Sequence, residues 1–261
     1  MNIKLVEHIY FVGIGGIGMS ALARYFNAKG KKVSGYDKTP SPITDALTAE
    51  GISLHFDENH VPKDIKDADF QSVLIVYTPA VSQDSPQLTS FVSKKWTILK
   101  RAELLGVITE DAYTIAVAGT HGKTTTSCIL SHILKYSDIY CTAFLGGISS
   151  NYNTNLILSE SVDIVVVEAD EYDRSFLKLS PDISIITSLD ADHLDIYNDV
   201  DDMKNTFKMF VAQVYALGHI NAYKNKHMKR AILFFGTAIL SELVIIMAMA
   251  WSLTWSQLFS Q

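Results

Sequence analysis

Gly119-Thr120-His121-Gly122-Lys123-Thr124-Thr125-Thr126 directly follows the apolar run Tyr113–Ala118. A buried strand, a glycine-rich turn and a Lys-Thr pair that opens a helix are the layout of a phosphate-binding loop. The glycines let backbone N–H groups approach phosphate oxygens, the Lys123 ammonium supplies charge for the β- and γ-phosphates, and the Thr124 hydroxyl can hold Mg²⁺. The common pattern has a glycine where this chain has Val117. We predict that the loop binds the phosphates of a nucleoside triphosphate through Gly119, Thr120, His121, Gly122, Lys123, Thr124 and Thr125.

A second glycine loop, Gly13-Ile14-Gly15-Gly16-Ile17-Gly18, follows the short apolar strand His8–Val12. A helix is predicted after it over Met19–Lys29, so the G-x-G-x-x-G pattern stands in the strand–turn–helix context of a dinucleotide-binding fingerprint. The next predicted strand, Lys32–Tyr36, ends at Asp37, where an acidic side chain can bind a ribose hydroxyl. These residues alone favour NAD as the ligand.

Acidic residues follow two further predicted strands. Asp163–Val167 ends in Glu168-Ala169-Asp170-Glu171, and Asp182–Ser188 leads into Asp190-Ala191-Asp192-His193-Leu194-Asp195. Ligands of parallel sheets bind at the carboxyl ends of the strands, and the Mg²⁺ of a nucleotide needs oxygen ligands there. Two such clusters beside a phosphate loop predict a site for a metal-bound nucleotide.

Strand-like and helix-like runs alternate through the first part of the chain. The strand-like runs are Lys32–Tyr36, Ser53–Phe56 and Ser72–Tyr77, and the helix candidates are Ile43–Glu50, Ser85–Lys94 and Arg101–Thr109. This alternation predicts an α/β fold, in which helices cover both faces of a parallel sheet. A boundary near Glu110-Asp111 would let each half begin its own phosphate site. We therefore expect a Rossmann-like domain over residues 1–109 and a P-loop ATPase-type α/β domain over residues 110–214.

Composition narrows the class of protein. The chain has 261 residues, of which 48% are hydrophobic and 19% charged, as in a globular protein of about two domains. The net charge of −6 gives no basic surface for a nucleic acid. Cys128 and Cys141 form neither a disulfide framework nor a metal motif, and we expect both in the core of a cytoplasmic protein. The N-terminal apolar run stops at the glycine loop, unlike a signal peptide.

Four motifs taken together resemble the Mur ligase family: Phe11–Ser20, Gly119–Thr126, Glu168–Glu171 and Asp190–His193. They stand in the family's order, and the resemblance covers about residues 9–214. It implies that the first loop holds the diphosphate of a UDP-sugar instead of NAD. The implied UDP-sugar-binding residues are Gly13, Gly15, Gly16, Gly18, Met19, Ser20, Asp37 and Thr78.

The resemblance also implies a reaction, the ATP-dependent ligation of L-alanine to the carboxylate of UDP-N-acetylmuramate in peptidoglycan synthesis. ATP phosphorylates the carboxylate, and the L-alanine amine then attacks the acyl phosphate. The implied catalytic residues are Lys123, Glu168 and His193. Lys123 stabilises the transferring phosphoryl group, whereas Thr124, Glu168 and His193 are the implied ligands of Mg²⁺.

The resemblance ends near Val214. Tyr215–Arg230 is polar and basic, and the 21 residues Ala231–Trp251 are almost wholly apolar. Such a run is long enough to span a bilayer, and the basic cluster before it would keep its N-terminal side in the cytoplasm. We expect residues 215–261 to be either an apolar helical membrane tether or the product of a frameshift. The family's third domain, which holds the amino acid, is not recognised here. The expectation is therefore an incomplete ATP domain and a truncated, inactive form.

Two other functions stay open. An NAD-dependent oxidoreductase rests on Gly13–Gly18 alone and leaves the Lys123 loop without a role. A non-catalytic module that binds a UDP-sugar or a nucleotide would use both loops without performing the ligation.

Overall fold

The computed structural model describes residues 3–94, 96–160, 164–190 and 196–214. By its internal contacts the chain separates into Met1–Val214 and Tyr215–Gln261. All described residues belong to the first unit. Within the described ranges no helix has the length and hydropathy to cross a membrane. The predicted span Ala231–Trp251 lies outside these ranges and stays a prediction.

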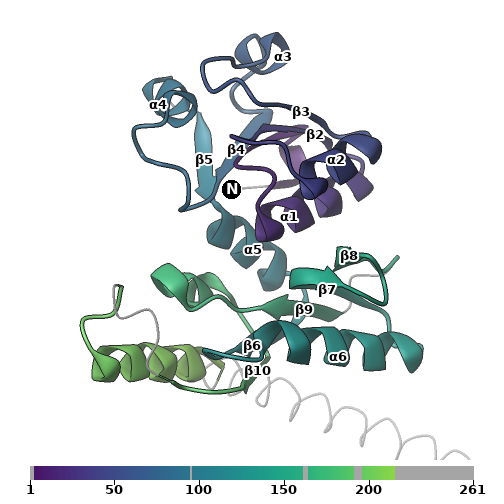
Figure 1. The fold of residues 1–261 in the computed structure, drawn as a ribbon, viewed down its shortest axis with the longest axis vertical. Helices are drawn as coiled ribbons and strands as arrows, with labels where there is room; N and C mark the ends of the chain where they lie inside the picture. Colours follow the sequence, from purple (N-terminus) through teal and green to yellow (C-terminus); the bar gives the residue numbers. More distant parts are fainter. Residues whose placement is uncertain (1–2, 95, 161–163, 191–195, 215–261) are drawn as a thin grey trace, which may run out of the picture. The chain divides into compact units, whose positions relative to one another are not determined.

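Five parallel strands form the first sheet (Figure 1). Their order across the sheet is β3-β2-β1-β4-β5. The strands are β1 (His8–Val12), β2 (Lys32–Tyr36), β3 (Ser53–His55), β4 (Val73–Tyr77) and β5 (Thr97–Lys100). In the register, Val12 aligns with both Tyr36 and Tyr77. The first glycine loop, Asp37 and Thr78 therefore leave the sheet side by side at its carboxyl edge.

Helices cover both faces of this sheet, because successive residues of a strand point to opposite sides. Ile9 and Phe11 of β1 pack in one apolar cluster with Leu22 of α1 (Ile17–Ala28). Tyr10 and Val12 pack in another with Phe91. The first face carries α1, α2 (Pro42–Ala49) and α5 (Arg101–Glu110), and the second carries α3 (Lys63–Lys66) and α4 (Pro86–Ser93). This arrangement confirms the predicted α/β architecture.

The second sheet has the order β10-β6-β9-β7-β8. Its strands are β6 (Tyr113–Ala118), β7 (Cys141–Ser149), β8 (Thr154–Ile157), β9 (Ile164–Glu168) and β10 (Ile183–Ile186). All neighbours run parallel except the antiparallel pair β7 and β8. One face packs on α6 (Lys123–Tyr136), where Leu130 and Leu134 pack against the apolar cluster that includes Val166.

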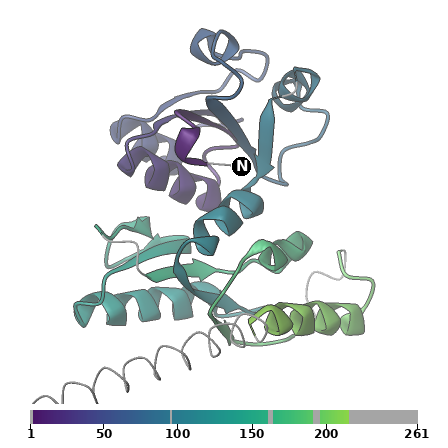
Figure 2. The same cartoon turned by 180° about the vertical axis from the view of Figure 1, so that it is seen from behind.

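A short 3-10 helix, η2 (Tyr172–Lys178), and a helix over residues 200–214 complete the second half (Figure 2). Phe176 of η2 stacks on Phe210, with ring centroids 4.7 Å apart, and meets Phe207 edge-on at 5.0 Å. A further 3-10 turn, η1 (Ile3–Leu5), precedes β1.

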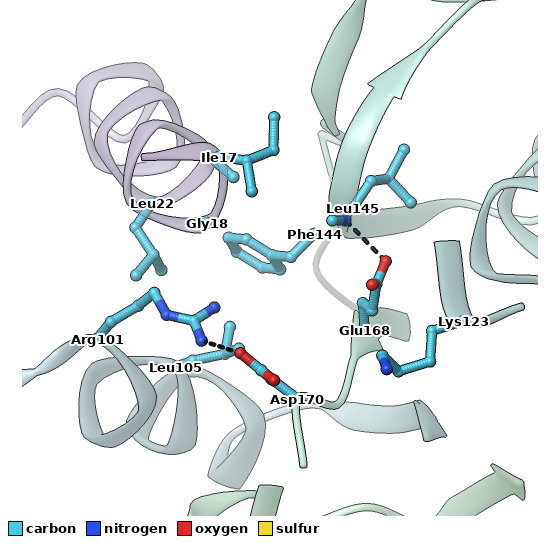
Figure 3. Close-up of a pocket in the computed structure, with 12 residues that line it drawn as sticks. Ile17, Gly18, Leu22, Arg101, Leu105, Lys123, Phe144, Leu145, Glu168 and Asp170 are labelled. Carbon is cyan, nitrogen blue, oxygen red and sulfur yellow. Dashed lines mark hydrogen bonds and ion pairs between the residues drawn. The ribbon is translucent and has the colours of Figure 1, made fainter. Parts of the chain in front are cut away.

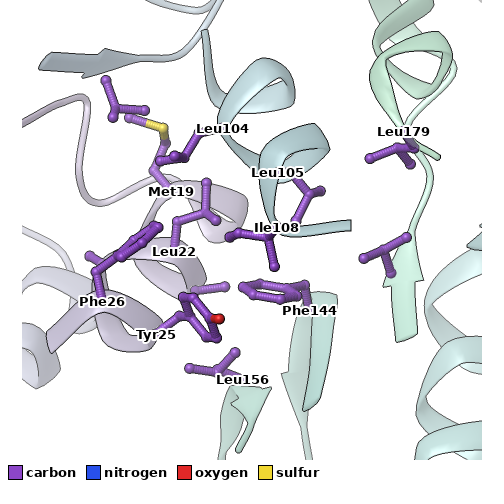
Figure 4. Packing of buried hydrophobic residues seen from close by; sticks show 14 of the residues in the cluster. Met19, Leu22, Tyr25, Phe26, Leu104, Leu105, Ile108, Phe144, Leu156 and Leu179 are labelled. Atoms are coloured by element: carbon purple, nitrogen blue, oxygen red, sulfur yellow. The ribbon is translucent and has the colours of Figure 1, made fainter. Parts of the chain in front are cut away.

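α1 contacts both sheets, as its burial pattern shows. Met19 to Ala23 are buried at five consecutive positions, whereas a helix on a single layer buries residues three and four apart. Phe144 of β7 and Leu156 of β8 belong to the same apolar cluster as Leu22, and the Tyr25 ring lies 5.3 Å from that of Phe144. From α5 the cluster includes Leu104, Leu105 and Ile108 (Figure 4). One core therefore joins the two halves of the first unit.

Most of the expected elements are present, although β10 is shorter than the predicted strand Asp182–Ser188, and α3, η1, η2 and the helix over residues 200–214 were not predicted. β1, β2 and β6 have the predicted bounds, and the predicted helices differ by one or two residues at their ends. β5, β7 and β8 were not predicted. The Gly146-Gly147 pair inside β7 is typical of a turn, and a register shift between Phe144 and Ser149 breaks the strand's alternation. Cys141 is buried as expected, but Cys128 is only partly buried.

A close backbone approach fixes η2 against α5. At Gly106 of α5, an added Cβ would collide with the backbone oxygen of Lys178 at the end of η2. Lys178 Nζ also lies 3.6 Å from Glu103 Oε1 on the same helix. Because η2 follows the Glu168–Glu171 motif directly, this contact positions the acidic cluster beside the first residue of α5.

We predict that Gly106→Ala lowers the free energy of unfolding by about 1–3 kcal/mol, because the new methyl group overpacks a site closed by backbone. This outcome opposes helix propensity, which favours alanine over glycine by about 1 kcal/mol. Urea denaturation followed by circular dichroism measures the change. Val92→Ala on the exposed side of α4 is the control and should have little effect. A stabilised Gly106→Ala variant would contradict the close approach.

Candidate functional site

The predicted phosphate loop connects β6 to α6. Gly119 and Gly122 have φ angles of +127° and +82°, in the region that favours glycine. α6 begins at Lys123, and its N-cap residue is Gly122. Because glycine has no side chain to accept a capping hydrogen bond, the backbone N–H groups of the first turn remain available to a ligand. This is the strand–loop–helix geometry that binds phosphate oxygens.

Lys123 makes an ion pair at the base of the loop. Its Nζ lies 2.8 Å from Glu171 Oε1 and also donates to the Gly119 carbonyl oxygen at 2.6 Å. The side chain of Glu171 is only 1% exposed and that of Lys123 16%. Tyr197 donates its hydroxyl to the Glu171 carbonyl oxygen at 2.6 Å. Burial raises the pKa of Tyr197 to about 12.

Glu168 joins the loop to the second sheet. The Thr124 hydroxyl donates to Glu168 Oε1 at 3.0 Å, and the Gly146 N–H donates to Oε2 at 2.8 Å. Gly146 lies where β7 loses its register with β8, which leaves its N–H free of that ladder. The carboxylate at the end of β9 is thus held beside the first turn of α6.

The segment that follows β10, residues 187–190, makes hydrogen bonds to the phosphate loop. The Thr120 hydroxyl lies 2.9 Å from Ser188 Oγ and accepts the Asp190 N–H at 3.0 Å. Ser188 Oγ also accepts the His121 N–H at 3.0 Å. The second acidic cluster therefore contacts the predicted phosphate loop through Asp190. Thr120 is buried, and its hydroxyl is used in these hydrogen bonds to Ser188 and Asp190.

The residues beside the loop can hold Mg²⁺. Among the described residues no group of three or more His, Cys, Asp or Glu side chains is arranged for a metal ion. Mg²⁺ bound to a nucleotide needs only one or two protein oxygens, with phosphate and water as its other ligands. The Thr124 hydroxyl and the Glu168 carboxylate, already 3.0 Å apart, supply such oxygens. The third predicted ligand, His193, lies outside the described residues, as do Asp192 and Asp195.

A cleft of about 470 Å³ lies at the first glycine loop. Of the residues predicted to bind the UDP-sugar, it is lined by Gly13, Gly15, Gly16, Asp37 and Thr78. Asp37 Oδ2 accepts the Gly15 N–H at 2.7 Å, so the acidic side chain is tied to the loop. The other three predicted residues lie elsewhere, because α1 begins at Ile17 and includes Gly18, Met19 and Ser20. Met19 and Ser20 are buried, and their role toward the sugar stays a prediction.

A smaller pocket of about 230 Å³ adjoins both loops (Figure 3). Gly18 lies at its first-sheet side, and Lys123 and Glu168 lie at its second-sheet side. Arg101, the first residue of α5, also lines it, and its Nη2 lies 2.7 Å from Asp170 Oδ2. The apolar wall includes Leu22, Leu105 and Phe144. The pocket thus contains two cations, two carboxylates and an apolar surface.

Sequence reasoning missed several of these residues. Arg101 was assigned only to a helix, because the strand β5 that places it at the sheet edge was not predicted. Glu171 was part of a quoted acidic motif but had no role assigned, and its pairing with Lys123 depends on tertiary structure. The sequence around Gly146 contains only a Gly-Gly pair, which does not indicate that its N–H would bind Glu168. Ser188 was seen only as the end of a strand.

Two family models match consecutive parts of the chain. The model described as the catalytic domain of the Mur ligase family matches residues 8–113. The model described as the Mur ligase middle domain matches residues 117–237 and so runs past Val214, where the motif resemblance ends.

Individual relatives agree with these matches. A UDP-N-acetylmuramate–L-alanine ligase of Porphyromonas gingivalis is 55% identical over 217 residues, and one of Flavobacterium johnsoniae is 53% identical over 216 residues. Each match covers 82% of this chain and 47% of the relative. The chain therefore spans about half the length of the curated relatives it matches.

Solved structures share the fold. The UDP-N-acetylmuramate–alanine ligase of Thermotoga maritima superposes with a TM-score of 0.69 at 31% identity, over 79% of this chain and 47% of that chain. A UDP-N-acetylmuramate:L-alanyl-γ-D-glutamyl-meso-diaminopimelate ligase of Neisseria meningitides superposes with a TM-score of 0.72 at 26% identity, over 80% of this chain and 68% of that chain. With both sheets matched and two successive family models covering residues 8–113 and 117–237, the chain belongs to the Mur ligase family.

Proposed function

We propose that this chain carries the sugar-nucleotide and ATP sites of a ligase that joins L-alanine to the carboxylate of UDP-N-acetylmuramate. The relatives named above are ligases of this kind and are more than half identical to it. The observation that carries the proposal is the meeting of Lys123, Thr124 and Glu168 at the first turn of α6. The reaction belongs to peptidoglycan synthesis in the cytoplasm.

The phosphate loop would bind the triphosphate of ATP. Its backbone N–H groups surround the phosphate oxygens, and the Lys123 ammonium moves from Glu171 Oε1 to the γ-phosphate. Phosphoryl transfer relies mainly on positioning and charge stabilisation, because the protein has little covalent chemistry to perform. The acceptor carboxylate attacks the γ-phosphorus and displaces ADP, which gives the acyl phosphate. The amine of L-alanine then attacks the acyl carbon, and the amide forms with loss of inorganic phosphate and a proton.

Thr124 and Glu168 would hold the Mg²⁺ of the nucleotide. When bound, the ion draws negative charge from the β- and γ-phosphates. The Gly146 N–H donates to Oε2 of Glu168 and so orients the carboxylate, with Oε1 facing the Thr124 hydroxyl. The protein thus presents both oxygens on the side of the loop.

The 470 Å³ cleft would bind the UDP part of the second substrate, with its diphosphate at the loop of Gly13, Gly15 and Gly16. The NAD hypothesis assigns no role to Lys123 or Glu168.

We predict that Lys123→Met weakens ATP binding by about 10- to 100-fold, the effect of losing a hydrogen bond to a charged group. Calorimetry with Mg²⁺ present measures the affinity. Lys135→Met is the matched control, because Lys135 lies on the last turn of the same helix and should leave the affinity unchanged. UDP-N-acetylmuramate binding should persist in both variants.

Folding must be separated from binding in this experiment. Removing Lys123 leaves the buried Glu171 carboxylate without its cation, and breaking such a pair costs about 3–5 kcal/mol. The double variant Lys123→Met/Glu171→Gln removes both charges and should recover stability in a thermal melt without recovering ATP affinity. If the double variant binds ATP as the wild type does, Lys123 has no role toward the phosphates.

We also predict that Thr124→Val and Glu168→Gln each remove most of the gain in ATP affinity that Mg²⁺ provides, because each loses an oxygen ligand. Affinity for metal-free ATP should change little. Titrations of ATP with Mg²⁺ and with EDTA measure the difference. Thr126→Val, two residues further along α6, is the control. An undiminished Mg²⁺ effect in Glu168→Gln would exclude Glu168 as a ligand.

A further inference from the structure

We propose that Arg101 binds the carboxylate of the acceptor substrate in the 230 Å³ pocket and holds it against the γ-phosphate site. This inference rests on the proposed function and adds to it a substrate-binding residue outside both glycine loops.

The position of Arg101 is fixed by its surroundings. It is the first residue of α5, directly after β5, and its side chain is 20% exposed. Nη1 lies only 2.5 Å from the place where a Cβ on Gly18 would stand. The last glycine of the first loop, Gly18, thus lets the guanidinium lie against the first turn of α1. A larger residue at position 18 would displace it.

The guanidinium has donors left for a ligand. It presents five N–H groups, and in the described part of the chain Asp170 is its sole ion-pair partner, through Nη2. Asp170 is itself held in place, because its Oδ1 accepts the Tyr172 N–H at 3.1 Å. The ion pair therefore orients the guanidinium while another of its edges can take a carboxylate in the two-point geometry that arginine favours.

The charges of the pocket suit the meeting of two anions. A carboxylate that attacks ATP must approach a triphosphate, and like charges at close range repel strongly in a partly buried site. Lys123 lines the pocket from the phosphate loop, and Arg101 lines it from α5. A carboxylate that binds between Lys123 and Arg101 has a cation on each side. The two carboxylates that also line the pocket already have partners, since Glu168 accepts two hydrogen bonds and Asp170 pairs with Arg101.

The apolar wall favours an organic acid over a further phosphate group. Leu22, Leu105 and Phe144 line the pocket beside Arg101. The ATP phosphates already have the backbone N–H groups of residues 119–124 as their site. A carboxylate on a short carbon chain would place its methyl and methylene groups on this wall and its oxygens at the guanidinium.

Two ligands test the proposal on the full chain: UDP-N-acetylmuramate and the same compound with its carboxyl group converted to the primary amide. Calorimetry should show that the wild type binds the acid about 10- to 100-fold more tightly than the amide. Arg101→Met should bring the affinity for the acid down to that for the amide. Arg101→Lys keeps the positive charge but loses the planar guanidinium that can make two parallel hydrogen bonds. Its affinity for the acid should therefore lie between those of the wild type and Arg101→Met.

Three measurements make the result decisive. Affinity for the amide and for ATP should be unchanged in Arg101→Met, and Lys100→Met, which removes the neighbouring exposed cation, should retain the full preference for the acid. Equal loss of both sugar nucleotides in Arg101→Met, or weakened ATP binding instead, would overturn the proposal. So would a wild type that binds acid and amide equally, a result that leaves the proposed function intact. A wild type that binds neither sugar nucleotide would refute the proposed function itself.

Discussion

The apolar core shared by the two sheets is the constraint on which the site depends. α1 begins at the first glycine loop, and its buried residues pack on Phe144 of β7. Phe144 stands two residues before Gly146, whose N–H holds Glu168. Burying a side chain of this size stabilises the fold by roughly 1.5–3 kcal/mol. The packing that buries α1 therefore also sets where the carboxylate lies relative to the first loop. Without this core, no packing interaction would hold the first glycine loop close to Glu168.

Charge compensation is the second condition that the site meets. The motif at the end of β9 places Glu168, Asp170 and Glu171 within four residues, and such a cluster would repel phosphates if nothing balanced its charge. Glu168 takes a hydroxyl and an N–H, Asp170 pairs with Arg101, and Glu171 pairs with Lys123. In the proposed function the Lys123 ammonium turns from Glu171 toward the phosphates, whereas Arg101 keeps its ion pair with Asp170 and binds the acceptor carboxylate through another edge of its guanidinium.

Much of this fold could be predicted from short sequence patterns of adjacent residues. β1, β6 and the loops that follow them were predicted because a buried strand, a glycine turn and a helix are adjacent in the sequence. The strand ends that carry Glu168 and Asp190 were predicted for the same reason. β7 and β8 were not, because an antiparallel edge with a register shift at Gly146-Gly147 has no regular period. The placement of Arg101 and the pairing of Glu171 with Lys123 depend on contacts between residues far apart in the chain, and no local pattern encodes them.

The first glycine loop shows why a motif alone did not identify its ligand. Its G-x-G-x-x-G pattern describes a turn and a helix start that serve any diphosphate. Asp37 accepts the N–H of Gly15, an arrangement as compatible with a dinucleotide as with a UDP-sugar. The distinction comes from what lies beyond Gly18. A hydride-transfer enzyme needs a substrate facing a nicotinamide ring, whereas the pocket here joins Gly18 to Lys123 at the start of α6 and Glu168 at the end of β9. Two glycine loops adjoin one pocket in which Lys123 and Arg101 stand beside two carboxylates that already have partners. Such a pocket is suited to bringing two anionic substrates together, and this arrangement, more than either motif, supports the proposed ligase function.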